Sequence, residues 1–205
     1  MISITSYDIP LIIAYIIVLF NLFIDTFLRP NADTRSFDLD NDTDKSSTLF
    51  VCIAFIIVLG VPVLILWVVI GLNDNLGIGV IESPYREILS WSGIILILFG
   101  FGLRAYAMRI NQFFTRTLRI GEGQFIVTEG PYRYIRHPGY AGQLLMWHGF
   151  ALSSGNWFVF IIISIIINIA YWYRIRCEEF MLLRTFGVDY LEYSTRVKKI
   201  IPFIY

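Results

Sequence analysis

Long apolar stretches are the feature that most constrains how this chain of 205 residues can fold. A helix needs about 20 mostly apolar residues to cross a bilayer, and several runs approach or exceed that length. Hydrophobic residues make up 57% of the sequence and charged residues only 16%, whereas soluble domains contain roughly 25% charged residues. The sequence therefore predicts an all-α, polytopic membrane protein rather than a soluble or disordered chain.

Five apolar segments are predicted to be transmembrane helices. They cover residues 9–28, 48–72, 88–108, 138–153 and 157–173. After the fifth segment, apolar residues recur at three- and four-residue steps over residues 177–197, which predicts a C-terminal amphipathic helix. Residues 109–137 are too polar for the bilayer and are predicted to form a large loop.

The positive charges predict how these helices are oriented. Of the 16 Lys and Arg residues, three lie in the first loop, twelve lie from Arg104 onward, and Arg86 lies in the second loop. With five spans, the first loop, the third loop and the C-terminus share one side. The positive-inside rule places that side in the cytoplasm and the N-terminus outside. Lys plus Arg and Asp plus Glu both total 16, so no charge excess indicates a nucleic-acid partner.

No metal site is predicted. The acidic loop over residues 31–47 has alternating aspartates but lacks the turn glycine and the distal glutamate of an EF-hand. The two histidines, His137 and His148, have no cysteine or carboxylate cluster with metal-ligand spacing. Instead, His148 in the fourth span is predicted to be a hydrogen-bonded structural residue or part of a pocket wall. Asn168 in the fifth span is predicted to have a similar structural role.

Residues 130–142 form the first of two polar segments on the predicted cytoplasmic side. The sequence Gly-Pro-Tyr-Arg-Tyr-Ile-Arg-His-Pro-Gly-Tyr-Ala-Gly places two arginines, one histidine and three tyrosines among prolines and glycines. The prolines stiffen the backbone, and the glycines permit tight turns or close approach of a ligand. This combination suits a ligand with a flat base, an anionic group and hydroxyls. Contact with anionic lipid headgroups is the alternative interpretation.

Residues 174–179, Arg-Ile-Arg-Cys-Glu-Glu, form the second polar segment. Arg174 and Glu178 are four residues apart, and Arg176 and Glu179 are three apart, so each pair shares a helical face. Exposed pairs of this kind contribute roughly 0.2–0.5 kcal/mol and need no function. However, ionisable groups next to an apolar span are costly and are usually functional. The segment therefore holds either surface salt bridges or part of a site.

Together the two segments resemble the signature of isoprenylcysteine carboxyl methyltransferases and their phospholipid N-methyltransferase relatives. The family pattern is Arg-His-Pro-x-Tyr-x-Gly, then an apolar hairpin, then Glu-Glu, and it reads here as residues 136–142 and 178–179. The flanking residues 113–117, 130–134 and 186–193 are also similar to family members. The resemblance covers roughly residues 100–205, and the first two spans carry no matching signal.

The resemblance implies an integral membrane methyltransferase that uses S-adenosylmethionine. It implies one membrane domain over residues 1–205, with two N-terminal spans in 1–87 and the catalytic core in 88–205. By resemblance, Arg174 and Glu178 lie at the reaction centre. The implied cofactor-binding residues are Gln124, Val127, Tyr132, Arg136, His137, Pro138, Tyr140 and Glu179. A lipophilic acceptor would enter from the bilayer, among membrane lipids.

These residue types are consistent with methyl transfer from a sulfonium to a carboxylate. A carboxylate is already ionised at pH 7 and needs a cation that orients it, for which Arg174 is the candidate. Glu178 would orient Arg174 or contact the cofactor near its amino group or sulfonium. If the acceptor were an amine, Glu178 could instead take its proton. The sequence predicts carboxyl O-methylation of an isoprenylcysteine-type substrate, with phospholipid amines or lipophilic thiols as alternative acceptors.

Two other classes of function remain open. Membrane reductases that bind NADPH resemble this family in their C-terminal halves, but five spans are few for a sterol cavity. A non-enzymatic membrane protein would use the basic loop to contact lipids or a partner. The Gly121-Glu-Gly123 step does not indicate a Rossmann-type nucleotide loop, because no predicted strand precedes it.

Overall fold

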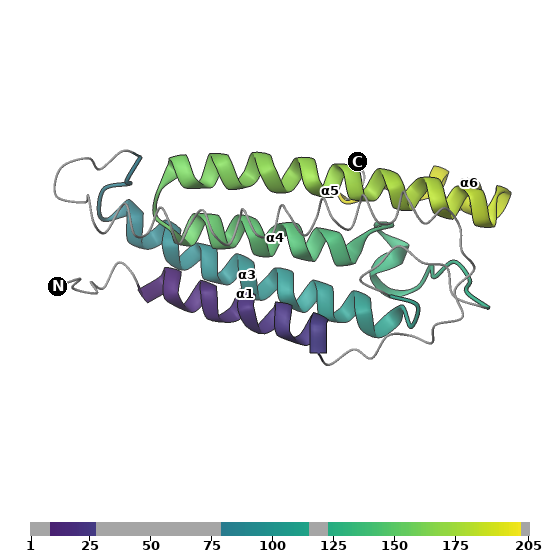
Figure 1. Ribbon diagram of the computed structural model, residues 1–205, viewed down its shortest axis with the longest axis horizontal. Coiled ribbons are helices and arrows are strands. Elements are labelled where there is room, and N and C mark those ends of the chain that lie inside the picture. The colour runs from purple at the N-terminus through teal and green to yellow at the C-terminus, as the bar shows by residue number, and fades with distance from the viewer. Residues whose placement is uncertain (1–8, 28–78, 115–122, 202–205) are drawn as a thin grey trace.

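The computed structural model describes residues 9–27, 79–114 and 123–201, which are helical and contain no extended strand (Figure 1). The predicted span over 48–72 and the acidic loop over 31–47 lie outside these residues. The elements are α1 (Ile9–Phe27), α3 (Tyr85–Ile110), the 3-10 helix η1 (Gly130–Arg133), α4 (Pro138–Ser153), α5 (Trp157–Phe186) and α6 (Val188–Arg196). The all-α prediction is confirmed for the described part of the chain.

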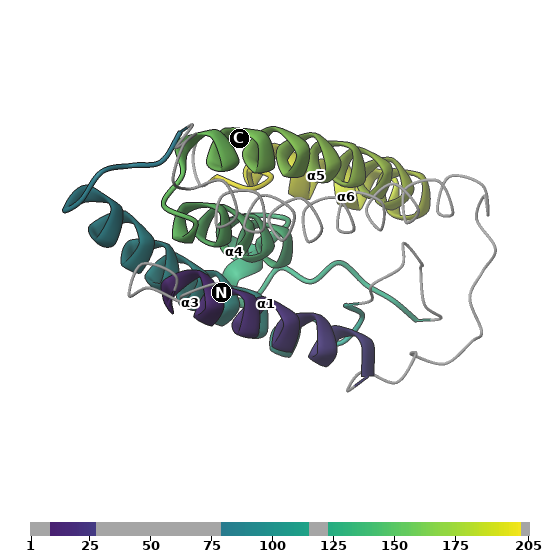
Figure 2. The same ribbon diagram turned by 60° about the vertical axis from the view of Figure 1, so that its left-hand side comes forward.

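The long helices lie side by side, with α4 between α3 and α5 (Figures 1 and 2). α3 and α5 run in one direction and α4 runs back between them, so α3 and α5 end where α4 begins. At the opposite end, Ile81 N donates to Gly155 O at 3.0 Å and Trp157 N donates to Gly79 O at 2.9 Å. The segment before α3 and the turn between α4 and α5 therefore share one end, as the predicted order of spans requires.

Two of the described helices, α3 and α5, are long and apolar enough to cross a membrane. Large apolar side chains on both point away from the bundle, and Ile95, Phe99 and Ile165 are all more than half exposed. The core lies around α4, where Trp147 and Phe150 are fully buried. This distribution suits a helical bundle surrounded by lipid, because lipid accepts apolar side chains that water would not.

α5 is longer than predicted. The sequence indicated a span over 157–173 and a separate helix over 177–197, but one helix of 30 residues runs from Trp157 to Phe186. No proline or glycine lies inside it, so nothing breaks the helix where the charged residues begin. At about 1.5 Å per residue it is about 45 Å long, which exceeds the roughly 30 Å hydrocarbon core. Its charged C-terminal part can thus extend beyond the bilayer.

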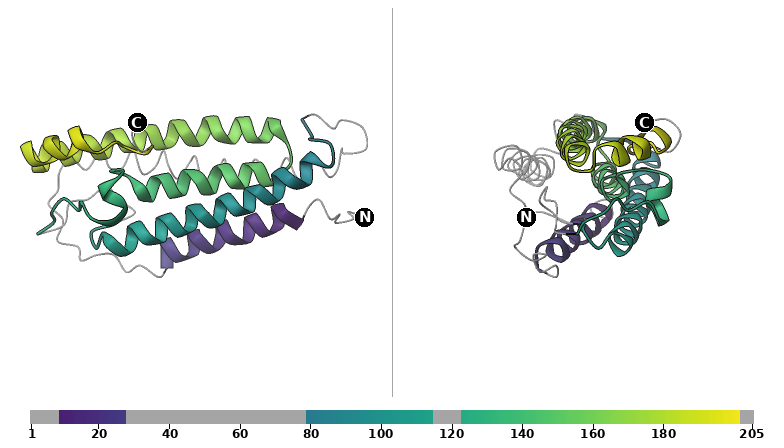
Figure 3. Two further views of the ribbon diagram at one scale, coloured as in Figure 1. Left: turned by 180° about the vertical axis from the view of Figure 1, so that it is seen from behind. Right: turned by 90° about the vertical axis from the view of Figure 1, so that its right-hand side faces the viewer.

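The prediction of one helix over residues 177–197 is also wrong, because the helix breaks near the middle of this range. Gly187 ends α5 with φ +53°, a left-handed conformation that favours glycine, and α6 begins at Val188. α6 folds back along the end of α5 (Figure 3). The break therefore turns the last helix toward the end of the bundle, where residues 130–142 also lie.

Glycine pairs bring α3 and α4 into close contact. A Cβ at Gly100 would lie 2.5 Å from Gly142 O, and a Cβ at Gly142 would lie 2.5 Å from Gly100 O. Gly93 and Gly149 repeat this reciprocal relationship at the same distances. Small residues allow such close backbone approach between helices in a membrane. Gly142 of the family pattern, which the sequence analysis assigned to a turn or a ligand contact, is thus a helix-packing residue.

The predicted structural role of His148 and Asn168 is confirmed. His148 Nδ1 lies 2.7 Å from Leu144 O, which can only accept, so Nδ1 carries the proton. Its Nε2 then accepts from Asn168 Nδ2 at 3.0 Å, and Asn168 also donates to Ser164 O at 2.8 Å. The pair links α4 to α5 by a hydrogen bond between a half-buried histidine and an exposed asparagine.

Candidate active site

A cleft opens at the end of the bundle where α3 ends and α4 begins. Its empty volume is about 800 Å³, including the part open to solvent. Residues from five segments line it: Asn111, Phe113 and Phe114 after α3; Gln124 to Val127; Tyr132, Arg136, His137, Gly139 and Tyr140; Glu178, Met181, Leu182 and Phe186 on α5; Tyr190 and Tyr193 on α6.

The cleft brings together most of the site residues that the sequence predicted. Six of the eight predicted cofactor residues line it: Gln124, Val127, Tyr132, Arg136, His137 and Tyr140. Pro138 is instead fully buried at the first position of α4. Glu179 does not line the cleft but is hydrogen-bonded to Arg136, which does. Glu178 lines the cleft, whereas Arg174 is buried beneath Tyr140 at 3% exposure.

Glu179 is the centre of the first hydrogen-bond network. Arg136 binds it with two parallel bonds, Nε to Oε1 and Nη2 to Oε2, both at 2.8 Å. His137 Nε2 and Tyr190 OH each donate to Oε1 at 2.9 Å. Lys199 Nζ lies 4.0 Å from Oε2. This carboxylate is therefore saturated by donors from three separate parts of the chain, which favours its ionised form.

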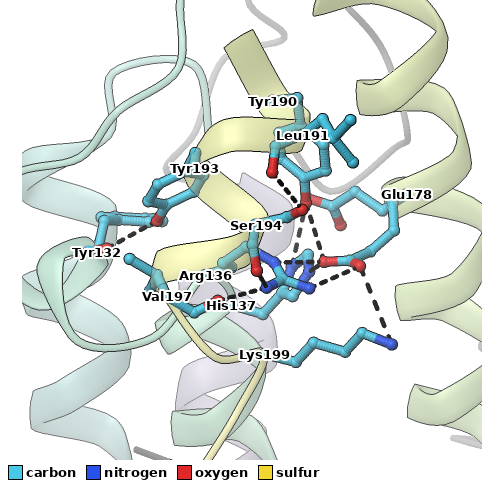
Figure 4. Close-up of polar contacts among 11 residues, drawn as sticks. Tyr132, Arg136, His137, Glu178, Tyr190, Leu191, Tyr193, Ser194, Val197 and Lys199 are labelled. Atoms are coloured by element: carbon cyan, nitrogen blue, oxygen red, sulfur yellow. Dashed lines mark hydrogen bonds and ion pairs between the residues drawn. The ribbon is translucent and has the colours of Figure 1, made fainter. Parts of the chain in front are cut away.

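Arg136 also reaches the end of α6. Its Nη1 donates to Ser194 O at 2.9 Å and to Val197 O, as Figure 4 shows. Burial alone would lower the pKa of Arg136, but the hydrogen bonds and the charge of Glu179 outweigh burial and raise the pKa. Arg136 thus stays charged, and it caps the C-terminal carbonyl groups of α6, where a cation is favourable.

Tyr140 is the centre of a second network, which faces the cleft. Its hydroxyl donates to Glu178 Oε2 and accepts from Arg174 Nε at 3.3 Å. Its ring stacks on the ring of His137 with 5.7 Å between centroids and 12° between planes. His137 Nδ1 lies 3.9 Å from Glu178 Oε1. The two predicted reaction-centre residues, Arg174 and Glu178, are therefore joined through a phenol.

The predicted pairing of Arg176 with Glu179 is wrong. Glu179 is bonded to Arg136 on the loop before α4, and the Arg176 guanidinium lies over the Trp172 ring at 4.6 Å from its centroid. Arg176 and Trp172 both face outward. An exposed tryptophan beside an arginine is typical of the membrane–water interface. This pair marks the level on α5 at which the charged segment leaves the apolar part.

Two tyrosines on α6 were not assigned a role by the sequence analysis, although residues 186–193 were included in the resemblance. Tyr190 and Tyr193 are three residues apart and therefore face the cleft together. Tyr193 OH donates to Tyr132 O at 2.7 Å. Burial and the nearby charge of Glu179 raise the pKa of Tyr190, so its hydroxyl remains a donor at neutral pH. Their three-residue spacing in the sequence could have indicated that both tyrosines lie on one face of a helix.

Aromatic rings form the wall opposite α5. Phe113 and Phe125 meet edge to face with 5.0 Å between centroids. The Phe114 ring lies against Gly139, where a Cβ would collide with it, and the Arg104 guanidinium lies 5.2 Å from the same ring. Gly139 of the family pattern is thus small because an aromatic ring of the cleft wall packs on it.

Comparisons with known proteins agree with this architecture. Residues 88–189 match the family described as "Phospholipid methyltransferase". A probable protein-S-isoprenylcysteine O-methyltransferase of Oryza sativa subsp. indica is 33% identical over 119 residues, covering 57% of this chain and 62% of that protein. Protein-S-isoprenylcysteine O-methyltransferase A of Arabidopsis thaliana is 33% identical over 115 residues, covering 55% and 58% respectively. The chain thus spans less than two thirds of the length of these relatives.

A solved structure shows the same fold. The eukaryotic intramembrane Ras methyltransferase, isoprenylcysteine carboxyl methyltransferase, superposes with a TM-score of 0.61 over 95% of this chain and 68% of that chain, at 22% identity. This chain therefore has the fold of an integral membrane methyltransferase, with a polar cleft at one end of the helical bundle. In sequence, residues 88–189 match the phospholipid methyltransferase family, and more than half of the chain is similar to protein-S-isoprenylcysteine O-methyltransferases.

Proposed function

We propose that this protein transfers a methyl group from S-adenosylmethionine to the carboxylate of an isoprenylcysteine-type lipid at the membrane surface. One observation carries the proposal: the two polar segments meet in one cleft, where Tyr140 joins Arg174 to Glu178. The relatives named above are called protein-S-isoprenylcysteine O-methyltransferases, which supports this choice of acceptor.

The residues of the cleft fit S-adenosylmethionine, which supplies an electrophilic methyl group on a cationic sulfur. Glu178 is the one acidic residue in the described lining, and it suits a cationic ligand. Tyr132, Phe125 and Tyr193 offer aromatic faces for a flat base, and Gln124 offers an amide for its polar edge. His137, Val127 and Tyr140 would complete the enclosure, with Pro138 fixing the start of α4.

Arg174 and Glu178 both form a hydrogen bond with the hydroxyl of Tyr140. The guanidinium of Arg174 is buried on the side of the bundle, where an anionic acceptor from the bilayer would meet it. Glu178 lies on the side of the cleft, where the cationic methyl donor would bind. Because an ionised carboxylate needs no general base, these residues contribute by orienting both groups and excluding water.

A phospholipid amine is the second candidate acceptor, because the matching family is described as phospholipid methyltransferases. An amine must lose a proton when it is methylated, and Glu178 is the carboxylate placed to accept it. The two acceptors therefore predict different roles for Arg174. A carboxylate acceptor needs this cation, whereas an amine acceptor would be repelled by it.

For the membrane arrangement, we propose five spans with the N-terminus outside and the catalytic cleft and C-terminus in the cytoplasm. The positive-inside rule supports this orientation. The Trp172–Arg176 pair supports an interface just below the cleft, so that lipids and a lipophilic acceptor would reach Arg174 from the bilayer.

Binding calorimetry on the full-length protein in detergent is the first test, with S-adenosylhomocysteine and NADPH as separate titrants. We expect saturable binding of S-adenosylhomocysteine alone. Binding of NADPH alone would indicate the reductase alternative. Binding of neither by a folded protein would indicate a non-enzymatic role.

The acceptor is tested by methyl transfer to farnesylcysteine, to its carboxamide and to phosphatidylethanolamine in mixed micelles. We expect transfer to the carboxylate alone. Arg174→Ala should lower this rate at least about 100-fold, because a buried cation is lost opposite an anion. Arg176→Ala, on the exposed side of the same helix, is the matched control and should retain activity. Transfer to phosphatidylethanolamine alone would overturn the carboxylate proposal.

A further inference from the structure

α6 forms one wall of the cleft, although its own packing is slight. It has nine residues, of which Tyr190 is the one that is buried, while Val188 and Leu191 are 78% and 52% exposed. So short a helix is marginal without tertiary contacts. Gly187, which precedes it, leaves open space around its Cα. The position of this wall must therefore depend on the polar contacts that α6 makes.

Three of these polar contacts converge on the pair formed by Arg136 and Glu179. Tyr190 OH donates to Glu179 Oε1 at 2.9 Å, and Arg136 Nη1 donates to Ser194 O at 2.9 Å. Arg136 Nη1 also donates to Val197 O, just after the helix. Since Arg136 and Glu179 are bonded to each other twice, they connect α6 to α5 through one shared unit.

The backbone around Arg136 continues this connection. Arg136 N donates to Lys198 O at 2.7 Å, and His137 N donates to Lys199 O at 2.9 Å. Ile135 and Lys198 form a parallel bridge. The segment after α6 therefore lies along the residues that precede α4, and the Arg136 side chain lies where these segments meet α5.

The hydrogen-bond inventory of Arg136 shows where its donors are directed. A guanidinium has five N–H groups, and four of these are needed for the bonds to Glu179, Ser194 and Val197. Both oxygens of Glu179 already accept from Arg136, and Oε1 accepts from two further donors. Arg136 lines the cleft, but most of its polar groups and those of Glu179 are already bonded to protein groups.

We infer that Arg136 and Glu179 are positioning residues, which hold α6 as the wall of the cleft instead of binding the methyl donor as its principal ligands. This inference rests on the proposed function only for the identity of the ligand. It predicts that loss of either residue releases residues 188–199 even when no ligand is present. It also predicts that the two residues act as one unit in ligand binding, because each works through the other.

Two readouts on the full-length protein test this inference. Amide hydrogen exchange of residues 188–199 is measured without ligand, and the Kd for S-adenosylhomocysteine is measured by calorimetry. In Arg136→Ala and Glu179→Ala we expect faster exchange of this segment and a Kd about 10- to 100-fold higher. The double variant should bind about as weakly as either single variant. Arg136→Lys and Glu179→Gln are milder changes for the case in which the alanine variants do not fold.

Arg196→Ala is the matched control, because Arg196 lies on α6 in an exposed pair with Glu192. Exchange and affinity should stay at the wild-type values in this variant. Unchanged exchange in the Arg136 and Glu179 variants, together with affinity losses that add in the double variant, would overturn the inference and make both residues direct ligands. If the wild type binds no S-adenosylhomocysteine, the proposed function fails, but exchange of the unliganded protein still tests the positioning role.

Discussion

Arg174 Nε donates to the hydroxyl of Tyr140 across 3.3 Å, and the same hydroxyl donates onward to Glu178. A single phenol thus joins a buried guanidinium to a carboxylate of the cleft. Because the hydroxyl proton is directed to Glu178, Tyr140 orients the two charged groups and does not itself supply a proton. Arg174 and Glu178 are one helical turn apart, and Tyr140 comes from the neighbouring helix.

Tyr140→Phe should lower kcat more than it raises the Kd of the methyl donor. The change removes two hydrogen bonds to charged groups, each worth about 1.5–3 kcal/mol, and keeps the ring stacked on His137. We expect a 10- to 100-fold loss of kcat, corresponding to about 1.4–2.8 kcal/mol. Single-turnover methyl transfer and calorimetry separate the two parameters. Equal losses in kcat and affinity would contradict a role in orientation.

Gly142→Ala should destabilise the bundle by about 1–3 kcal/mol, the usual cost of an added methyl group in a packed interface. Its Cβ would lie 2.5 Å from Gly100 O and 2.8 Å from Arg104 N, and both are backbone atoms that cannot rotate away. Thermal unfolding in detergent measures the change. Gly102→Ala on α3 is the control, since a methyl group added there would meet no atom within 4 Å.

Tyr190→Phe should lower stability by a constant amount from neutral pH to about pH 10. Burial and the charge of Glu179 raise the folded-state pKa of Tyr190 above the ordinary tyrosine value near 10. A group whose pKa is raised on folding contributes fully below its unfolded pKa, and the contribution is lost as the pH rises through the folded value. The difference in Tm between the two proteins, measured against pH, should therefore shrink only above about pH 10. Shrinkage between pH 7 and 9 would contradict this assignment.

Gly139→Ala should weaken binding of S-adenosylhomocysteine, because the new methyl group would displace the Phe114 ring into the cleft. Overpacking of this kind typically costs about 1–3 kcal/mol, or roughly a 5- to 150-fold rise in Kd if it falls on binding. Combining it with Phe114→Leu relieves the collision and should recover part of the affinity. No recovery in the double variant would show that glycine is needed there for another reason.

The bounds of α4 could be predicted because local signals set both of its ends. Pro138 begins the helix, and the Ser-Gly-Asn turn after Ser153 leads to Asn156, which caps α5 by accepting from Phe158 N at 2.9 Å. The continuation of α5 to Phe186 was missed, because polarity was taken as the end of the helix. Arginine, glutamate and leucine all favour helix, so charge alone does not end one.

The partners within the site could be predicted only in part. Spacing along one helix suggested that Glu179 pairs with Arg176, but its partner Arg136 is 43 residues away. The backbone N–H groups of Arg136 and His137 donate to the carbonyl groups of Lys198 and Lys199. Backbone bonds do not depend on side-chain type, so the sequence carries no pattern that predicts them. The family pattern indicated that a small residue is needed at Gly142. It did not indicate the reason, which is the close approach of the Gly100 backbone on α3.

The uninterrupted course of α5 has a consequence for the setting in which this protein works. Trp157 and Arg174 belong to one rigid rod and are separated by about 25 Å along its axis, at about 1.5 Å per residue. If the protein has the proposed function and membrane arrangement, Arg174 is therefore held at a fixed height above the far leaflet. Acyl-chain length in the surrounding lipid would then affect the proposed methyl transfer, since a thicker or thinner bilayer moves its polar surface relative to a side chain whose height is fixed.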